Sequence, residues 1–264
     1  MNFKSKTVLI TGSNRGIGLA LAKRFANEHC HLILTMRKAQ PLLQKQLLSA
    51  GAQSVQIFEL DLLQPVKIEE FLVETKKLSV DVLVNNAGLL CGGLLEQQNM
   101  SEIYQMMQVN LLALIHLTHG LLPTLLTRPE ALIINNASVS GIMHFPCATT
   151  YSASKSAVLA FTESLKSELV GTSIKTLLMI TSGVKTRMFD EIPKLYGDHL
   201  DLSITSGFIT AEKWADCVVR AAIKDLEVVY PPHALTHLSL ATAKHFPKIF
   251  NRFISQKFTR LKLP

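Results

Sequence analysis

Short apolar runs that alternate with longer segments of helical periodicity are the feature that most constrains this fold. The runs lie at 6–11, 31–35, 55–60, 80–88, 131–138, 173–180 and 227–230. Strands that are apolar on both faces and joined by helices are typical of a parallel sheet covered on both sides. The sequence therefore predicts an α/β fold, a single Rossmann-like, doubly wound parallel sheet of about seven strands with helices on both faces.

The composition fits one large domain. No repeat, linker or change of composition divides residues 1–264, and 48% of them are hydrophobic against 18% charged. The four cysteines are scattered without metal-ligand spacing, which predicts reduced thiols, no metal site and a cytoplasmic location. The first apolar run is too short for a signal peptide. We find no stretch of about 20 apolar residues, so no membrane-spanning helix is expected.

The positive charge is concentrated at one end of the chain. Of the formal net charge of +7, residues 231–264 carry +6, because they hold six Lys and Arg residues and no acid. A basic character confined to a tail, with no nucleic-acid-binding motif, argues against binding of DNA or RNA.

A glycine-rich turn follows the first predicted strand. The sequence TGSNRGIG places Gly12, Gly16 and Gly18 between that strand and an amphipathic helix. Glycines there let the backbone approach a pyrophosphate, which the helix N-terminus attracts. The spacing is G-x-x-x-G-x-G rather than the general G-x-G-x-x-G. The turn and its position predict a dinucleotide site.

The end of the second predicted strand indicates which dinucleotide. An Asp or Glu there binds the ribose 2′-hydroxyl of NAD, whereas an Arg suits a 2′-phosphate. The sequence ILTMRK has no acid and has Arg37 and Lys38 in place. Arg15, in the glycine turn, is within reach of the same position. These residues predict NADPH or NADP⁺ as the cofactor.

The pentapeptide YSASK, at 151–155, follows a serine by thirteen positions. On a helix Tyr151 and Lys155 share one face, and a neighbouring ammonium makes a tyrosine more acidic. A surface helix with an incidental Tyr and Lys is the alternative. The helix is expected over 151–170, ending at Gly171. Its apolar stripe is wide enough either to contact a partner subunit or to be buried within one domain.

Taken together, these residues resemble the short-chain dehydrogenase/reductase family over about residues 5–230. Asp61 in ELDL matches the family's adenine-contacting residue, and its NNAG motif is intact at 85–88. The family's catalytic tetrad matches Asn110, Ser138, Tyr151 and Lys155. The cofactor-binding residues implied by the motifs are Gly12, Asn14, Arg15, Gly16, Ile17, Gly18, Arg37, Lys38, Asp61, Leu62, Asn86, Ala87, Gly88, Tyr151, Lys155, Gly183, Val184 and Thr186.

The resemblance implies a mechanism and a partner state. Tyr151 would exchange a proton with the substrate oxygen while the nicotinamide transfers a hydride. Ser138 would bind the substrate oxygen, Lys155 the nicotinamide ribose, and Asn110 a water of a proton relay. A homodimer or homotetramer is expected. One residue departs from the family pattern: in TSGVKT, Ser182 replaces the usual proline, which loosens the turn beside the nicotinamide.

The loops after the later strands are mostly apolar, which predicts a hydrophobic carbonyl or alcohol substrate. The substrate-binding residues expected are Ser138, Met143, His144, Phe145, Tyr151 and Met188, with 189–212 as a lid. Leu89, Leu90, Cys91 and Phe189 also lie in these loops. A catalytically silent NADPH-binding sensor or scaffold is the alternative function, and a nucleotide-sugar epimerase is a weaker one.

The tail at 231–264 alternates aromatic and aliphatic residues with cations at helical spacing. A basic amphipathic helix of this kind can lie on an anionic membrane. A segment packed over the substrate pocket or against a partner subunit has the same pattern. The sequence leaves these alternatives open.

Overall fold

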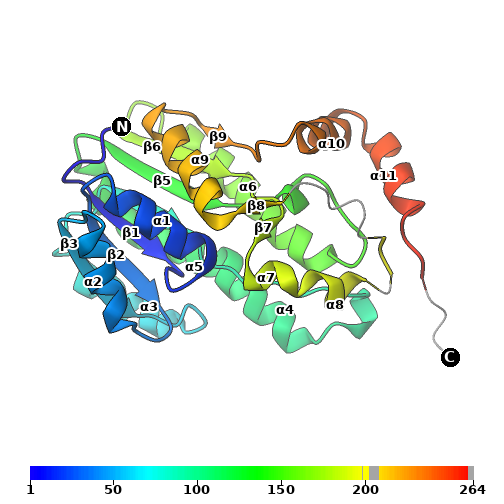
Figure 1. The fold of residues 1–264 in the computed structure, drawn as a ribbon, viewed down its shortest axis with the longest axis horizontal. Coiled ribbons are helices and arrows are strands. Elements are labelled where there is room, and N and C mark those ends of the chain that lie inside the picture. The colour runs from blue at the N-terminus through cyan, green and yellow to red at the C-terminus, as the bar shows by residue number, and fades with distance from the viewer. Residues whose placement is uncertain (198, 202–207, 261–264) are drawn as a thin grey trace.

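The computed structural model describes residues 1–197, 199–201 and 208–260. Its main sheet has seven parallel strands in the order β3-β2-β1-β4-β5-β6-β9 (Figure 1). The strands are β1 (Thr7–Thr11), β2 (His31–Met36), β3 (Ser54–Glu59), β4 (Val82–Asn85), β5 (Ala131–Asn136), β6 (Ile174–Met179) and β9 (Val228–Val229). The order turns back between β1 and β4, so the predicted doubly wound sheet is confirmed.

Helices cover both faces of this sheet (Figure 1). One core joins the sheet to α1 (Gly16–Ala26), α2 (Pro41–Ser49) and α9 (Ala211–Ile223). The other joins it to α3 (Pro65–Thr75), α5 (Ala113–Leu126) and α6 (Thr149–Glu168). The remaining elements are η1 (Leu95–Gln97), α4 (Met100–Met107), η2 (Gln108–Leu112), η3 (Val139–Gly141), β7 (Val184–Lys185), α7 (Arg187–Asp190), α8 (Ile192–Tyr196), β8 (Ile209–Thr210), α10 (Ala234–His245) and α11 (Pro247–Ser255).

Two elements have ends that differ from the predicted ones. A side-chain hydroxyl binds the amides that follow β4, and a glycine follows α6. β4 is shorter than the predicted run 80–88, because the amides of Asn86 and Ala87 donate to the Thr11 hydroxyl instead, at 2.9 and 3.0 Å. α6 begins at Thr149 and ends at Glu168. Gly171 follows with a φ of +83°, a left-handed conformation that favours glycine.

The apolar stripe expected on α6 is only partly buried. Val158 and Leu165 are in the core, whereas Ala153 and Ala160 are exposed. The predicted homodimer or homotetramer stays a prediction, and these exposed small residues belong to the surface on which it would depend.

The elements α4, η2 and α5 form one continuous helical segment, Met100–Leu126. This segment is long and apolar enough to cross a membrane, and its mean hydropathy is 1.5 over its most apolar window. The expectation of no such segment is therefore not met on length and composition. In the fold this run is the crossover between β4 and β5 and packs beside α3 and α6. Leu117 and Leu121 are buried in the core, so a core crossover accounts for the apolar character.

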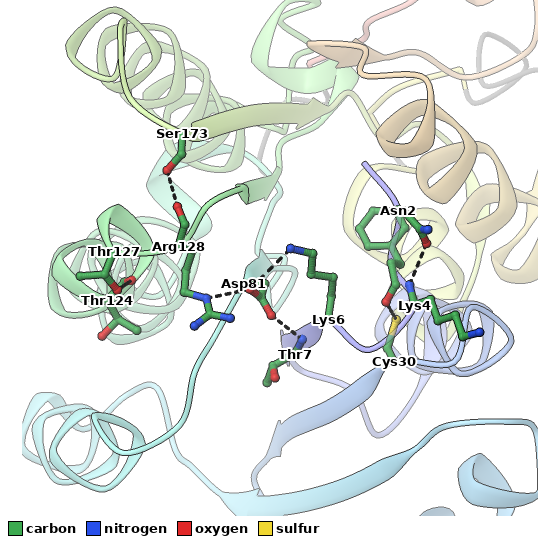
Figure 2. Close-up of polar contacts among 11 residues, drawn as sticks. Asn2, Lys4, Lys6, Thr7, Cys30, Asp81, Thr124, Thr127, Arg128 and Ser173 are labelled. Atoms are coloured by element: carbon green, nitrogen blue, oxygen red, sulfur yellow. Dashed lines mark hydrogen bonds and ion pairs between the residues drawn. The ribbon is translucent and has the colours of Figure 1, made fainter.

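A buried carboxylate secures the sheet at the end opposite the glycine turn. Asp81 is 2% exposed and accepts hydrogen bonds from the Thr7 amide and the Arg128 Nε, each at 2.8 Å (Figure 2). The Lys6 ammonium lies 3.9 Å away. The Arg128 carbonyl in turn accepts from the Ser173 hydroxyl at 2.6 Å. These contacts connect the segments that precede β1, β4, β5 and β6.

Replacement of Asp81 by Ala should lower the free energy of unfolding by about 3 kcal/mol, because it leaves a partly buried amide and a partly buried guanidinium without their acceptor. Urea denaturation followed by circular dichroism measures this change. Glu70→Ala is the matched control: its pair with Lys67 is more than half exposed on both sides, so its loss should change stability by less than about 1 kcal/mol. Equal effects of the two variants would contradict the expectation.

Candidate active site

The glycine turn forms a cradle that only glycine permits. Gly12 and Gly16 have φ angles of +65° and +55°, in the left-handed region. A Cβ on Gly18 would lie 2.2 Å from the Gly12 carbonyl oxygen, which no side chain can tolerate. The turn leads directly into α1, so free amides at the helix N-terminus face the space above it.

A cleft of about 590 Å³ opens above this turn, along the carboxyl ends of the strands. Six of its lining residues are cationic and two are acidic: Arg15, Lys23, Arg37, Lys155, Lys185 and Arg187 against Asp61 and Glu212. This excess of positive charge suits an anionic ligand such as a dinucleotide. Lys23, Lys185 and Arg187 were not predicted as site residues, although Lys185 and Arg187 directly flank the predicted residue Thr186.

Most of the predicted cofactor-binding residues line this cleft. They are Gly12, Asn14, Arg15, Gly16, Ile17, Gly18, Arg37, Asp61, Leu62, Asn86, Ala87, Gly88, Tyr151, Lys155 and Thr186. Lys38 is exposed and does not line it, which leaves Arg15 and Arg37 as the predicted phosphate ligands that do. Gly183 and Val184 line a neighbouring cavity.

The asparagines of the NNAG segment hold the turn and the sheet together. The side-chain nitrogen of Asn86 donates to the Thr11 carbonyl at 2.9 Å, and the side-chain oxygen of Asn86 accepts from the side chain of Asn136 at 3.2 Å. Asn85 donates to Asn135 and to Thr118, at 2.9 and 3.0 Å. These buried bonds fix the backbone on which the cleft is built.

Tyr151 lies where the cleft meets a second cavity, and its side chain lines both. It is on the first turn of α6, beside the Ser138 side chain, with which it forms a hydrogen bond. Burial raises the pKa of Tyr151 to about 12, and the bond with Ser138 opposes that rise. The phenol is therefore protonated at neutral pH.

Lys155 lies one helical turn along α6 and is only 4% exposed. Its Nζ donates to the Asn136 carbonyl at 2.8 Å and lies 5.9 Å from the centre of the Tyr151 ring. Burial lowers the pKa of Lys155 to about 8. The expected increase in the acidity of Tyr151 is thus not seen in the protein alone, because burial of both groups outweighs the charge of Lys155.

Asn110 lies in a π-helical turn, η2, between α4 and α5. Its side-chain oxygen accepts from the Leu89 amide at 2.7 Å, and its nitrogen donates to the Leu89 carbonyl and to the Ser154 hydroxyl. π-Helical turns often occur at functional sites. Sequence reasoning missed Ser154, the partner of Asn110, and Asn136, the partner of Lys155, since their roles depend on contacts between distant segments.

The second cavity, of about 470 Å³, is the candidate substrate pocket. Ser138, Met143, Phe145, Tyr151 and Met188 line it, as predicted, and so do Leu90 and Phe189. His144 does not: its side chain is exposed and lies 3.4 Å from the Ser140 carbonyl. Leu89 lines the cofactor cleft instead, and Cys91 is buried beside Met106.

The model of the family described as short chain dehydrogenase matches residues 6–196. The chain belongs to the short-chain dehydrogenase family. This is a family of oxidoreductases, and the sequence-based resemblance is confirmed.

Known relatives resemble the chain over most of its length. The ketoacyl reductase HetN of a Nostoc species is 29% identical over 256 residues, 94% of this chain and 87% of that protein. A short-chain dehydrogenase from Burkholderia cenocepacia, solved with NADP, superposes with a TM-score of 0.78 at 22% identity over 96% and 99% of the chains. One from Burkholderia phymatum, solved with NAD, gives 0.78 at 23% over the full length of both. These structures establish the fold.

Two further helices of this short-chain dehydrogenase line the candidate substrate pocket. α10 contributes Leu235, Thr236, Leu238, Ser239 and Thr242, and α11 contributes Ile249, Phe250, Phe253 and Ile254. The C-terminal segment therefore packs over the pocket, which is one of the alternatives that the sequence left open.

Ser182, the departure from the family pattern, lies between Thr181, which lines both cavities, and Gly183, which lines the second. Its hydroxyl is buried and has no hydrogen-bond partner within the described part of the chain. The turn nevertheless stays ordered by its backbone, since the Gly183 carbonyl accepts from the Ile209 amide at 3.1 Å.

The predicted lid, 189–212, includes residues 198 and 202–207, which lie outside the described residues. Its described parts contribute Phe189, and Ile192 and Tyr196 of α8, to the pocket lining. The Phe189 ring meets the Phe208 ring edge to face at 5.0 Å. Gly92 allows Tyr196 to approach, because a Cβ there would lie 2.1 Å from its ring.

Proposed function

We propose that this protein is an NADPH-dependent oxidoreductase that interconverts a carbonyl and an alcohol on a hydrophobic small molecule. The observation that carries the proposal is the position of Tyr151, whose side chain lines both the cationic cleft and the apolar pocket. A proton donor at that junction can serve a reaction between a molecule in the cleft and one in the pocket.

The cleft fits a dinucleotide. The three glycines leave the space that side chains would fill, and the N-terminus of α1 provides free amides for the pyrophosphate. Arg15 and Arg37 are the candidates to bind a ribose 2′-phosphate, and Lys155 and Asn86 line the cleft farther along. A bound nicotinamide would supply the hydride, which is chemistry that side chains cannot provide.

In carbonyl reduction, Tyr151 would donate its phenolic proton to the substrate oxygen, while a bound nicotinamide would supply the hydride to the carbonyl carbon. Ser138 donates a hydrogen bond to the same oxygen and stabilises the negative charge that develops there. The positive charge of Lys155 stabilises the phenolate that remains, and proton uptake from solvent restores the phenol. Asn110 holds the backbone of Leu89, a residue that lines the cofactor cleft, through two hydrogen bonds.

The pocket and the ionisation state favour reduction of an apolar carbonyl. Most of the pocket lining is aliphatic or aromatic, so an apolar substrate gains free energy by leaving water. A phenol with a pKa of about 12 is already in the form that donates a proton at neutral pH. Alcohol oxidation would instead require the phenolate.

The cofactor is tested by fluorescence titration with NADPH and NADH. We expect tighter binding of NADPH, and Arg37→Ala should weaken NADPH binding about 10- to 100-fold, because it removes a charge-assisted contact to the 2′-phosphate. NADH binding should hardly change. Lys38→Ala is the matched control: it removes a neighbouring exposed cation that does not line the cleft. Equal affinities for the two cofactors would refute the assignment of NADPH.

A further inference from the structure

The rim of the substrate pocket consists of apolar side chains that are largely exposed. Leu235 and Leu238 of α10, and Ile249 and Phe253 of α11, line the pocket, yet between 52% and 65% of each residue's surface is exposed. These helices lie at one end of the molecule, and α2 and α3 lie at the other (Figure 1). An exposed apolar patch of this kind marks a surface that gains free energy when it is covered.

The side chains of α11 form three strips along the helix. Each strip is a pair of residues four positions apart, and neighbouring strips differ by one position in the sequence. One strip is buried in the core, the next is apolar and exposed, and the third is basic and exposed. In that order the strips are Phe250 with Ile254, Ile249 with Phe253, and Lys248 with Arg252. An exposed apolar strip flanked by cations is typical of a helix that lies in the interface of a membrane.

The cations beside this rim are not paired. Lys244, Lys248 and Arg252 are exposed and form no ion pair within the described part of the chain. The other described cations of the segment are paired, Lys257 with Asp201 and Arg260 with Glu96. Because residues 231–264 include no acid, the unpaired cations of this segment give it an excess of positive charge that complements an anionic surface.

We propose that α10 and α11 dock on an anionic lipid bilayer and that the pocket takes its carbonyl substrate directly from that bilayer. Phe246 supports a bilayer over a soluble ligand, since it is 61% exposed but does not line the pocket. The apolar surface therefore extends beyond the area that a substrate would cover. The three unpaired cations also lie outside the pocket lining, where lipid phosphates can reach them. A second copy of the chain would bring like charges together.

Docking on the bilayer and uptake of the substrate from it depend on different features of the protein. Docking depends only on the surface of α10 and α11, whereas uptake of a substrate from the bilayer also rests on the proposed reductase function. An apolar carbonyl partitions into the acyl region, and the rim would then connect that region to Tyr151 without a path through water.

Docking is tested by sedimentation of the full-length protein with vesicles. One set is phosphatidylcholine alone, and the other is equal parts phosphatidylcholine and phosphatidylserine. We expect the protein to pellet with the anionic vesicles, and less as salt is added. Lys244→Gln/Lys248→Gln/Arg252→Gln should weaken this partition about a hundredfold, from roughly fivefold per cation. Phe246→Ser should weaken it roughly tenfold.

A matched control removes three exposed cations at the other end of the molecule, by Lys45→Gln/Lys76→Gln/Lys77→Gln. It has the same net charge as the test variant and should keep vesicle binding. Circular dichroism confirms that each variant is folded. Absence of pelleting with anionic vesicles, or equal losses in both triple variants, would overturn the docking claim. So would loss of a dimer in light scattering on Phe246→Ser with vesicle binding unchanged, because the rim would then be an interface between copies.

Uptake from the bilayer is tested with two carbonyls. For a short, soluble aldehyde, both triple variants should retain the wild-type kcat/KM. For a long-chain aldehyde incorporated in anionic vesicles, the α10–α11 triple variant alone should be slower, by about the factor lost in binding. Equal rates of all variants on the vesicle substrate would refute uptake. No turnover of either aldehyde by the wild type, with vesicle binding intact, would instead refute the reductase function.

Discussion

Tyr151→Phe should lower turnover of a carbonyl substrate about a thousandfold and leave NADPH affinity nearly unchanged. The substitution removes only the hydroxyl, which is the proton donor and the partner of Ser138. General acid catalysis contributes about 10²- to 10⁴-fold to a rate. The ring stays in place between the two cavities, so the cofactor cleft keeps its shape. Steady-state kinetics and a fluorescence titration of the same preparation measure the two quantities.

The control for this variant is Tyr104→Phe, on α4. Tyr104 is 67% exposed and lines neither cavity, so removal of its hydroxyl should change neither quantity. Unchanged turnover in Tyr151→Phe would show that another group donates the proton. A wild-type protein that binds NADPH tightly but reduces no member of a panel of apolar carbonyls would favour the alternative of a catalytically silent sensor.

Lys155→Met should lower kcat/KM about a hundredfold or more, and should also weaken cofactor binding. Methionine retains most of the apolar stem but removes the ammonium, which lies 5.9 Å from the centre of the Tyr151 ring and lines the cleft. The Asn136 carbonyl loses its donor, so a melting curve must accompany the kinetics. Lys166→Met, on an exposed turn of the same helix, is the matched control and should behave as the wild type.

The pH dependence identifies Lys155 independently. Burial lowers its pKa to about 8, so the ammonium is present below that pH and is lost above it. The kcat/KM for the cofactor reports ionisation in the free enzyme and should fall about tenfold per pH unit above pH ~8. Tyr151, with a pKa of about 12, contributes nothing in that range. A profile that stays flat to pH 10 would show that the charge of Lys155 is not required.

The sheet and the cofactor end could be predicted because their signals are local. A continuous apolar run predicts a buried strand, and the glycines of the turn after β1 are required by the backbone itself, as the φ of Gly12 and the contact at Gly18 show. The tetrad was predicted because its four residue types recur in a fixed order. The predictions were wrong for two residues whose side chains could lie either in the site or in solvent. Arg37 lines the cleft and Lys38 does not. Met143 and Phe145 line the pocket, while His144 between them is exposed.

The sequence by itself determined the family, the order of the strands and helices, and the residues that can carry the chemistry, because each depends on short-range pattern. Only the tertiary structure decided how those residues ionise and what surrounds the substrate. Burial is a property of the whole fold. It raises the pKa of Tyr151, against the direction expected from its spacing to Lys155, and it lowers the pKa of Lys155. The position of α10 and α11 over the pocket likewise depends on packing between segments about 100 residues apart, which no local pattern encodes.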